Sequence, residues 1–275
     1  MSAALLELDH VSKTYGRGGL FGLRRVKAVD DVSFSIEAER PVIFTIIGES
    51  GSGKSTIARM VLNITQPTSG RLMFRERNLA TIKSMAERRA FMREVQPIYQ
   101  NPFEAFNPLT RLDHYLVSTA TRLAGVADRE AAERLADEAL HSVGLTLREV
   151  KGRFPHELSG GQLQRAAIAR AVLSKPSLIV ADEPVSMVDA SLRMEIVNVF
   201  KDLRDRLKIS IIYITHDLAT AYYTSDEVII MRKGEVVERG PARPVLARPT
   251  HPYSQKLKDA VLSPPPMTAG AADPL

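Results

Sequence analysis

The 275-residue chain contains no cysteine and no tryptophan. Without cysteine, it cannot form a disulfide, a thiolate metal site or a cysteine-bound iron–sulfur cluster. No apolar run approaches the roughly 18 to 20 residues that a membrane-spanning helix needs. The opening stretch, MSAALLELDH, carries acidic residues where a secretory signal peptide carries basic ones. We therefore expect a protein that is made and kept in the cytoplasm.

The composition is that of an ordinary globular protein, with 44% hydrophobic and 25% charged residues. A chain of this length can form one large domain or two small ones and can bury a sizeable core. The formal net charge of +5 permits contact with nucleic acid, a lipid surface or a nucleotide. A scattered surplus of Lys and Arg does not choose among these partners.

Short apolar stretches rich in β-forming residues recur along the chain, and several precede segments of helical period. They read ALLELDHV, VSFSI, VIFTII, RLMF, SLIVAD, SIIYIT and EVIIM. This alternation predicts an α/β fold with a largely parallel sheet. Residues 42–47, 177–181 and 209–214 are almost unbroken apolar runs, which is typical of central strands covered on both faces.

Two other regions have a different character. From Thr110 to Val150 the sequence has no strand signal, and Leu, Ala and Val recur at helical spacing, which predicts a helical subdomain inserted at about 110–160. The final SPPPMTAGAADPL is rich in Pro and Ala and has little to bury. We expect one domain over residues 1–263 and a disordered tail over residues 264–275.

The stretch GESGSGKST matches the phosphate-binding pattern G-x-x-x-x-G-K-[ST] from Gly48 to Ser55. It follows an apolar strand and precedes a helical segment, which is the context that this motif requires and which a fortuitous Gly/Ser loop would lack. Backbone N–H groups of such a turn, together with the helix N-terminus, attract phosphate oxygens. Lys54 is expected to reach the β- and γ-phosphates, Ser55 to bind Mg²⁺ and Thr56 to bond another phosphate oxygen. The expected nucleotide-binding residues here are Gly48, Glu49, Ser50, Gly51, Ser52, Gly53, Lys54, Ser55 and Thr56.

A metal anchor is expected from LIVADEP, residues 178–184. An apolar strand that ends in Asp182 delivers a carboxylate to the carboxyl edge of the sheet, beside the glycine-rich loop. Glu183 follows at once and is a candidate to orient or deprotonate a water that attacks the γ-phosphate. A solvated pair of strand-end acids is the alternative for the two residues taken alone.

A second glycine-rich turn begins a helix in LSGGQLQRAAIARA, residues 158–171. These residues resemble the signature loop of the ATP-binding cassette family, and the resemblance extends from about Leu5 to about Pro264. It implies a P-loop NTPase (RecA-like) α/β core with a mostly parallel sheet, an antiparallel β subdomain and an inserted α-helical subdomain. In this family two cassettes pair head to tail, and each ATP lies between the glycine-rich loop of one and the signature loop of the other. The resemblance therefore places Ser159, Gly160, Gly161 and Gln162 at the nucleotide of a neighbouring cassette.

Four more positions match motifs of this family. Tyr15, in SKTYG, matches the aromatic that stacks on adenine, and Gln100, in PIYQNPFEAFNP, matches the Q-loop glutamine that touches Mg²⁺ or the attacking water. Asp189 matches the D-loop across the dimer interface. His216, after SIIYIT, matches the switch histidine that bonds the γ-phosphate. The resemblance implies ATP and Mg²⁺ as cofactors, catalytic roles for Lys54, Gln100, Glu183 and His216, and metal ligands at Ser55, Gln100 and Asp182.

Departures from the family pattern are mild. The D-loop commonly reads SALD, and here Met187 and Val188 stand in it; close relatives often carry Asp and Leu where this chain has Asn101 and Phe106. A nucleotide-binding scaffold without turnover would be expected to lose Glu183 or His216. Both are present, so we expect a site competent for hydrolysis.

Three segments resemble the ATPases of oligopeptide and dipeptide permeases. These are the basic arm GRGGLFGLRRVKAVDDVSFSI before the second strand, NPFEAFNP, and RPTHPYSQKLKDAVLSP. The resemblance implies an importer ATPase at the cytoplasmic face of the inner membrane, paired with a second, related ATPase, two transmembrane permease subunits and, indirectly, an extracytoplasmic solute-binding protein. It favours a heterodimer and leaves peptides, nickel or oligosaccharides open as cargo. Close relatives often carry a longer tail with a cysteine cluster, which this chain cannot have.

An alternative function is a soluble cassette ATPase that acts on nucleic acid or ribosomes, which the basic charge mildly favours. Such proteins usually fuse two cassettes or insert coiled coils or zinc modules. This chain shows none of these features. The importer interpretation is therefore preferred, with no nucleic-acid partner expected.

Overall fold

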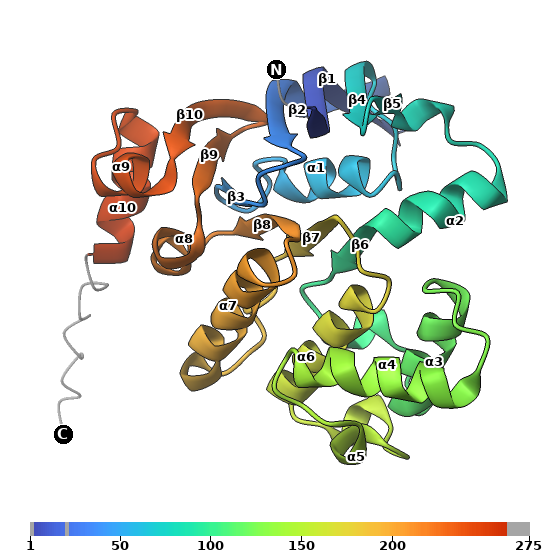
Figure 1. Cartoon of the computed structure of the whole chain (residues 1–275). Helices are drawn as coiled ribbons and strands as arrows, with labels where there is room; N and C mark the ends of the chain where they lie inside the picture. Colours follow the sequence, from blue (N-terminus) through green and yellow to red (C-terminus); the bar gives the residue numbers. More distant parts are fainter. Residues whose placement is uncertain (1–2, 20–21, 263–275) are drawn as a thin grey trace, which may run out of the picture.

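A computed structural model describes residues 3–19 and 22–262 (Figure 1). The strands are β1 (Ala4–Gly19), β2 (Gly22–Glu37), β3 (Ile43–Ile47), β4 (Ser69–Phe74), β5 (Arg77–Asn78), β6 (Val95–Ile98), β7 (Leu178–Asp182), β8 (Ser210–Thr215), β9 (Glu227–Arg232) and β10 (Glu235–Pro241). The α-helices are α1 (Lys54–Val61), α2 (Met85–Glu94), α3 (Leu112–Arg122), α4 (Arg129–His141), α5 (Leu147–Val150), α6 (Gly160–Val172), α7 (Ala190–Asp205), α8 (Leu218–Thr224), α9 (Ala242–Ala247) and α10 (Pro252–Leu262).

The larger sheet has the strand order β10-β9-β3-β8-β7-β6. All neighbouring pairs in it are parallel except β9 and β10, which form an antiparallel edge. The three predicted central strands are confirmed as β3, β7 and β8, and every residue of β3 and β8 is buried. Parallel strands are covered on both faces, which explains their nearly continuous apolar sequences.

The two faces of this sheet pack against different layers. Ile46, Val180 and Ile212 point to one face, where they pack with Ile57 of α1 and with the smaller sheet. The opposite face packs against α6 and α7, and the same core continues into α3 and α4. The α/β fold with a mostly parallel sheet is therefore confirmed.

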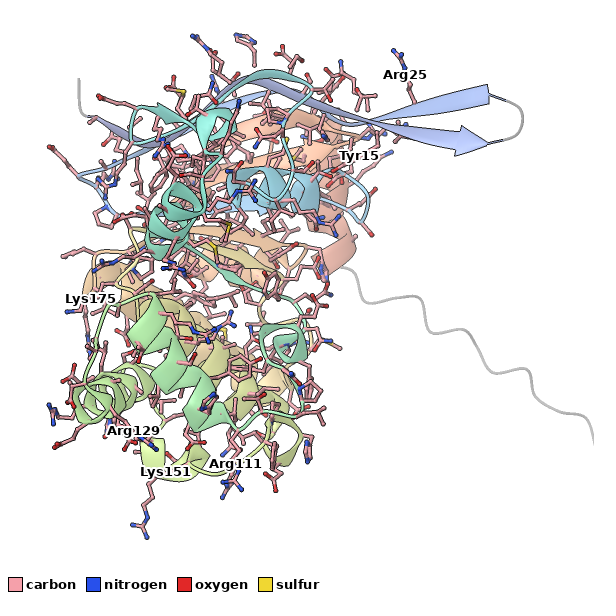
Figure 2. All side chains as sticks on the ribbon, turned by 90° about the vertical axis from the view of Figure 1, so that its right-hand side faces the viewer. Tyr15, Arg25, Arg111, Arg129, Lys151 and Lys175 are labelled. Atoms are coloured by element: carbon pink, nitrogen blue, oxygen red, sulfur yellow. The ribbon has the colours of Figure 1, made fainter. Side chains whose placement is uncertain are left out.

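The smaller sheet is antiparallel, with the order β2-β1-β4-β5. Its strands β1 and β2 form a long hairpin that projects beyond the body of the molecule, with Arg25 on the β2 side (Figure 2). The basic segment expected as an arm before the second strand is in fact largely strand, because β2 begins at Gly22 and pairs Val26 with Tyr15. Backbone pairing does not require apolar side chains, so the hairpin extends past its apolar part.

Residues 110–160 contain helices and no strand, as the sequence predicts. Asp128 caps α4 by accepting the Ala131 N–H at 2.7 Å, and Thr146 forms a capping box with Glu149 at the start of α5. Helices α3, α4 and α6 pack together at the end of the molecule opposite β1 and β2 (Figure 1). The predicted tail, residues 264–275, lies outside the described residues.

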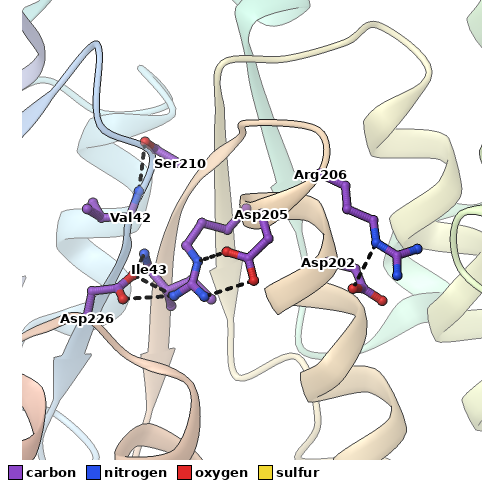
Figure 3. A network of polar contacts seen from close by, with 8 residues as sticks. Val42, Ile43, Asp202, Asp205, Arg206, Ser210 and Asp226 are labelled. Atoms are coloured by element: carbon purple, nitrogen blue, oxygen red, sulfur yellow. Dashed lines mark hydrogen bonds and ion pairs between the residues drawn. The ribbon is translucent and has the colours of Figure 1, made fainter.

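A polar network fixes the start of β3 (Figure 3). The Asp226 carboxylate accepts the Ile43 N–H at 2.8 Å and the Arg204 guanidinium at 2.8 Å. Arg204 also donates to Asp205 from Nε at 2.7 Å, and the Ser210 hydroxyl accepts the Val42 N–H at 3.4 Å. The strand that leads into the glycine-rich loop is thus held at its N-terminal end.

Over residues 3–19 and 22–262, no helix combines the length and apolar character needed to cross a bilayer.

Candidate active site

The glycine-rich loop connects β3 to α1, as expected from the sequence. Gly53, the residue before α1, has φ of 107°, and a Cβ atom there would lie 2.3 Å from the Ala28 carbonyl oxygen. Both the left-handed backbone and the close approach require glycine. Gly53 also contributes no side-chain cap to α1, and the Thr56 N–H bonds to the Gly53 carbonyl at 3.0 Å, so the N–H groups of Lys54 and Ser55 are the ones that this helix start offers to an anion.

Lys54 lies beneath the loop with only 5% of its surface exposed. Its Nζ donates to the carbonyl oxygens of Gly48 at 2.6 Å and Glu49 at 2.8 Å. Burial lowers the pKa of Lys54, and the nearby carboxylates of Glu183 and Asp182 oppose that shift. The carbonyl oxygens of the loop thus hold the Lys54 ammonium in position.

Asp182 ends β7 and is half-buried beside Ser55, the second residue of α1. Burial raises the pKa of Asp182, and the Ser55 hydroxyl opposes the shift by hydrogen bonding. A carboxylate, a hydroxyl and the oxygen of the Gln100 amide are all hard oxygen donors, which suit Mg²⁺ when phosphate oxygens complete the coordination. These three residues fit a magnesium ion by the chemistry of their donors.

Glu183 lies between two other side chains predicted for the site. Its carboxylate accepts a hydrogen bond from Gln100 Nε2 at 3.4 Å and another from His216 Nδ1 at 3.1 Å. Since a carboxylate only accepts, His216 carries its proton on Nδ1 in this contact. Glu183 itself has φ of 46°, a left-handed conformation that is costly for a side chain and that concentrates at functional sites.

These residues line one cavity of about 850 Å³, whose predicted members come from five separate segments of the chain. The predicted lining residues are Tyr15, Gly48, Glu49, Ser50, Gly51, Gly53, Lys54, Ser55, Thr56, Gln100, Asp182, Glu183 and His216. The cavity has four further lining residues that the sequence analysis did not identify: Ala28, Leu218, Leu257 and Ala260. Ser52, in the same loop, is buried and does not line this cavity. Leu257 and Ala260 belong to α10, about 200 residues after the glycine-rich loop. Only their apolar character could have indicated a place in the cavity.

The signature segment lies on a different part of the molecule. None of Ser159, Gly160, Gly161, Gln162 and Asp189 lines the cavity. Ser159 caps α6 by accepting the Gln162 N–H at 3.2 Å, and Ser159, Gly160 and Asp189 are exposed. The D-loop lies beside this helix start, since a Cβ on Gly160 would be 3.6 Å from the Met187 carbonyl oxygen. Met187 is 61% exposed, so the surface around the signature segment includes an apolar side chain.

Comparison with known proteins defines the family. The model of the ABC transporter family matches residues 29–186. A probable peptide ABC transporter ATP-binding protein of Sinorhizobium fredii is 37% identical over 278 residues, which cover 100% of this chain and 77% of that protein. The oligopeptide transport ATP-binding protein OppF of Bacillus subtilis is 36% identical over 269 residues, covering 97% of this chain and 85% of that protein. The dipeptide transport ATP-binding protein DppF of Haemophilus influenzae is 37% identical over 244 residues, with coverages of 88% and 73%.

Solved structures agree with the fold. A dimeric ATP-binding cassette in a post-hydrolysis state with bound ADP and phosphate has a TM-score of 0.75 and 26% identity, covering 86% of this chain and 99% of that chain. Another dimeric structure of the same cassette, described as bacterial, has a TM-score of 0.76 at the same identity and coverage. The chain therefore belongs to the ABC transporter family. Within it, the chain is an ATP-binding subunit that hydrolyses ATP, as its sequence predicts.

Proposed function

We propose that ATP binds in the cavity between the glycine-rich loop and Glu183. The β- and γ-phosphates lie on the N–H groups of the loop, with Lys54 as their cation and Tyr15 against the adenine. Ser55, Asp182 and Gln100 hold Mg²⁺, which neutralises charge on the phosphate oxygens when bound. The convergence of Gln100 and His216 on the Glu183 carboxylate is the observation that carries this proposal.

In this proposal the Glu183 carboxylate orients a water molecule and takes one of its protons. The water oxygen then bonds to the γ-phosphorus while the bond to the ADP oxygen breaks. Gln100 orients the same water, and the Nδ1–H of His216 turns from Glu183 to donate a hydrogen bond to the γ-phosphate. The contacts of both side chains with Glu183 keep these groups within reach of one another.

A second cassette completes the site in this proposal. The exposed Ser159 and Gly160, at the capped start of α6, approach the γ-phosphate that a neighbouring subunit holds. Asp189 lies at the same interface. The resemblance of the sequence to permease ATPases favours a heterodimer with a related ATPase, and the dimeric structures of a cassette of similar fold support the head-to-tail pairing.

We further propose that hydrolysis powers import of peptides or similar small solutes. The subunit docks on two transmembrane permease subunits at the cytoplasmic face of the inner membrane, and an extracytoplasmic solute-binding protein delivers the cargo. The peptide-transport names of the relatives support this assignment.

Two variants test the roles of the site residues. Lys54→Ala should lower the affinity for ATP at least about tenfold, because it removes a buried cation that faces the phosphates. Glu183→Gln should still bind ATP but lose at least about 100-fold in turnover, a typical loss when a general base is removed. Mixed with the proposed partner ATPase, this variant should also accumulate in an ATP-bound dimer, which size-exclusion chromatography with ATP detects.

The two variants separate binding from chemistry. Met85→Ala is a matched control, since Met85 is 76% exposed and does not line the cavity. It should behave as wild type in both assays. The general-base assignment would be contradicted if Glu183→Gln turned over ATP at the wild-type rate and its dimer dissociated as the wild-type dimer does.

A further inference from the structure

Helix α10 is fastened to the body of the protein through Glu238 on β10. The Glu238 carboxylate accepts the Thr250 N–H at 2.8 Å, the Thr250 hydroxyl at 3.1 Å and the His251 N–H at 3.3 Å. His251 then caps the helix, because its Nδ1 accepts the Tyr253 N–H at 3.1 Å. These contacts set the position of the first turn of α10 relative to the sheet.

Tyr253, in this first turn, is buried with 6% of its surface exposed. Its ring packs in a small core with Ile47 and Leu246, and the Arg232 guanidinium lies 5.2 Å from the ring centroid. Its hydroxyl accepts the N–H of Glu49, the second residue of the glycine-rich loop, at 3.1 Å. The ring is thus fixed by packing, and its polar end reaches the nucleotide-binding loop.

The Glu49 N–H and the Gly48 carbonyl belong to one planar peptide group. The carbonyl of this group accepts Lys54 Nζ at 2.6 Å, while its N–H donates to Tyr253. Because the group is rigid and bonded at both ends, the Tyr253 hydroxyl fixes the orientation of the carbonyl that holds Lys54. Two hydrogen bonds through one peptide also polarise each other.

We propose that Tyr253 is a positioning residue for nucleotide binding, which acts on Lys54 through the Gly48–Glu49 peptide. Helix α10 is then a wall of the nucleotide site and not only a cap on the C-terminal side of the sheet. Its Leu257 and Ala260 line the same cavity. This inference rests on the proposed contact of Lys54 with the phosphates of ATP.

The Tyr253→Phe variant of the full chain tests this role. It removes the hydroxyl and keeps the ring that packs beside Arg232. The Kd for ATP, measured with a fluorescent ATP analogue, and the KM for ATP should both rise roughly threefold to tenfold, as for the loss of one hydrogen bond. The kcat should stay unchanged, because the residues on Glu183 are untouched, and the melting temperature should fall by about 5 °C at most, as for the loss of one hydrogen bond.

Tyr223→Phe is the matched control. It also removes a tyrosine hydroxyl that makes one hydrogen bond, to Asn198 Oδ1 at 2.9 Å, but Tyr223 does not line the cavity. It should leave the Kd and KM for ATP unchanged. A wild-type Kd in Tyr253→Phe, or an equal rise in Tyr223→Phe, overturns the inference.

Lys54→Ala, measured in the same assay, separates the positioning role of Tyr253 from the contact of Lys54 with the phosphates. If it weakens ATP binding while Tyr253→Phe does not, only the positioning role of Tyr253 fails. If Lys54→Ala binds ATP like wild type, the proposed contact of Lys54 with the phosphates fails as well.

Discussion

Gly53 combines two constraints in one residue. Its φ of 107° disfavours any side chain by about 1 to 2 kcal/mol, and a Cβ atom would also lie 2.3 Å from the Ala28 carbonyl oxygen. Gly152 has a similar φ of 77°, but a Cβ there would meet nothing within 4 Å. The two glycines therefore separate the cost of backbone conformation from the cost of a steric clash.

Gly53→Ala should lower the free energy of unfolding by more than the conformational cost alone and should weaken ATP binding by more than about tenfold, since Ala28 or the loop must move. Gly152→Ala should lower stability by about 1 to 2 kcal/mol and leave ATP binding unchanged. Chemical denaturation and ATP titration measure both effects. Equal ATP affinities in the two variants would show that the approach to Ala28 does not shape the loop.

At the residue scale, much of the site is predictable because each motif indicates the local backbone structure, a loop or a strand end, that places its residues. Gly48 to Thr56 follow a buried strand, and Asp182 ends another with Glu183 directly after it, so parallel topology brings them to one edge. Gln100 and His216 were placed by family resemblance, and the structure brings both to Glu183. Tyr253 was missed in this role, because its contact with Glu49 joins residues 204 positions apart and no periodic pattern records such a contact.

At the level of elements, burial decides which strands a sequence reveals. The three runs that became β3, β7 and β8 are buried on both faces, so their apolar character is continuous. The edge strands β6, VQPI, and β10, EVVERGP, were not identified, since one is very short and the other is polar. An edge strand exposes one side to solvent and keeps less of the apolar pattern.

The network at the start of β3 is the element-scale feature with the clearest energetic consequence (Figure 3). Asp226→Asn keeps the shape of the side chain but weakens its bonds to Arg204 and to the Ile43 N–H. The Arg204 side chain is 16% exposed and that of Asp226 is 32% exposed, so solvent screens the pair only in part. We expect a loss of about 1 to 2 kcal/mol in the free energy of unfolding, measured by chemical denaturation.

Asp202→Asn provides the control for this change, because Asp202 lies on α7, the helix that also carries Arg204. Its partner Arg206 is 79% exposed and the ion pair spans 3.5 Å. Such exposed pairs contribute little, so the change should stay within about 0.5 kcal/mol. If both variants lost the same stability, the network around Asp226 would have no special role in holding β3.

On the scale of the whole molecule, the signature segment and the nucleotide cavity lie apart in one subunit. Gly160 is exposed, and a side chain there would have room within the subunit. Gly160→Glu should therefore leave ATP binding to its own cavity intact. It should prevent dimer formation with ATP in the Glu183→Gln background, because the new carboxylate would face the phosphates of the partner's nucleotide.

Met85→Glu is the matched control for this prediction. Met85 is the first residue of α2, as Gly160 is of α6, so both changes add an acid at the favourable end of a helix. Size-exclusion chromatography with ATP and the proposed partner ATPase should show a dimer for Met85→Glu and separate subunits for Gly160→Glu. A dimer for both would argue against head-to-tail pairing through the signature segment.

Strand β3 lies between β8 and β9, with all five of its residues buried. Its amide hydrogens should therefore exchange with deuterium only when the whole domain unfolds. Those of the projecting part of the β1–β2 hairpin should exchange through local fraying. The glycine-rich loop starts where this strand ends. One end of the loop is thus connected to a strand that we expect to be among the last segments to unfold. ATP and ADP can therefore bind and dissociate while β3 keeps its hydrogen bonds.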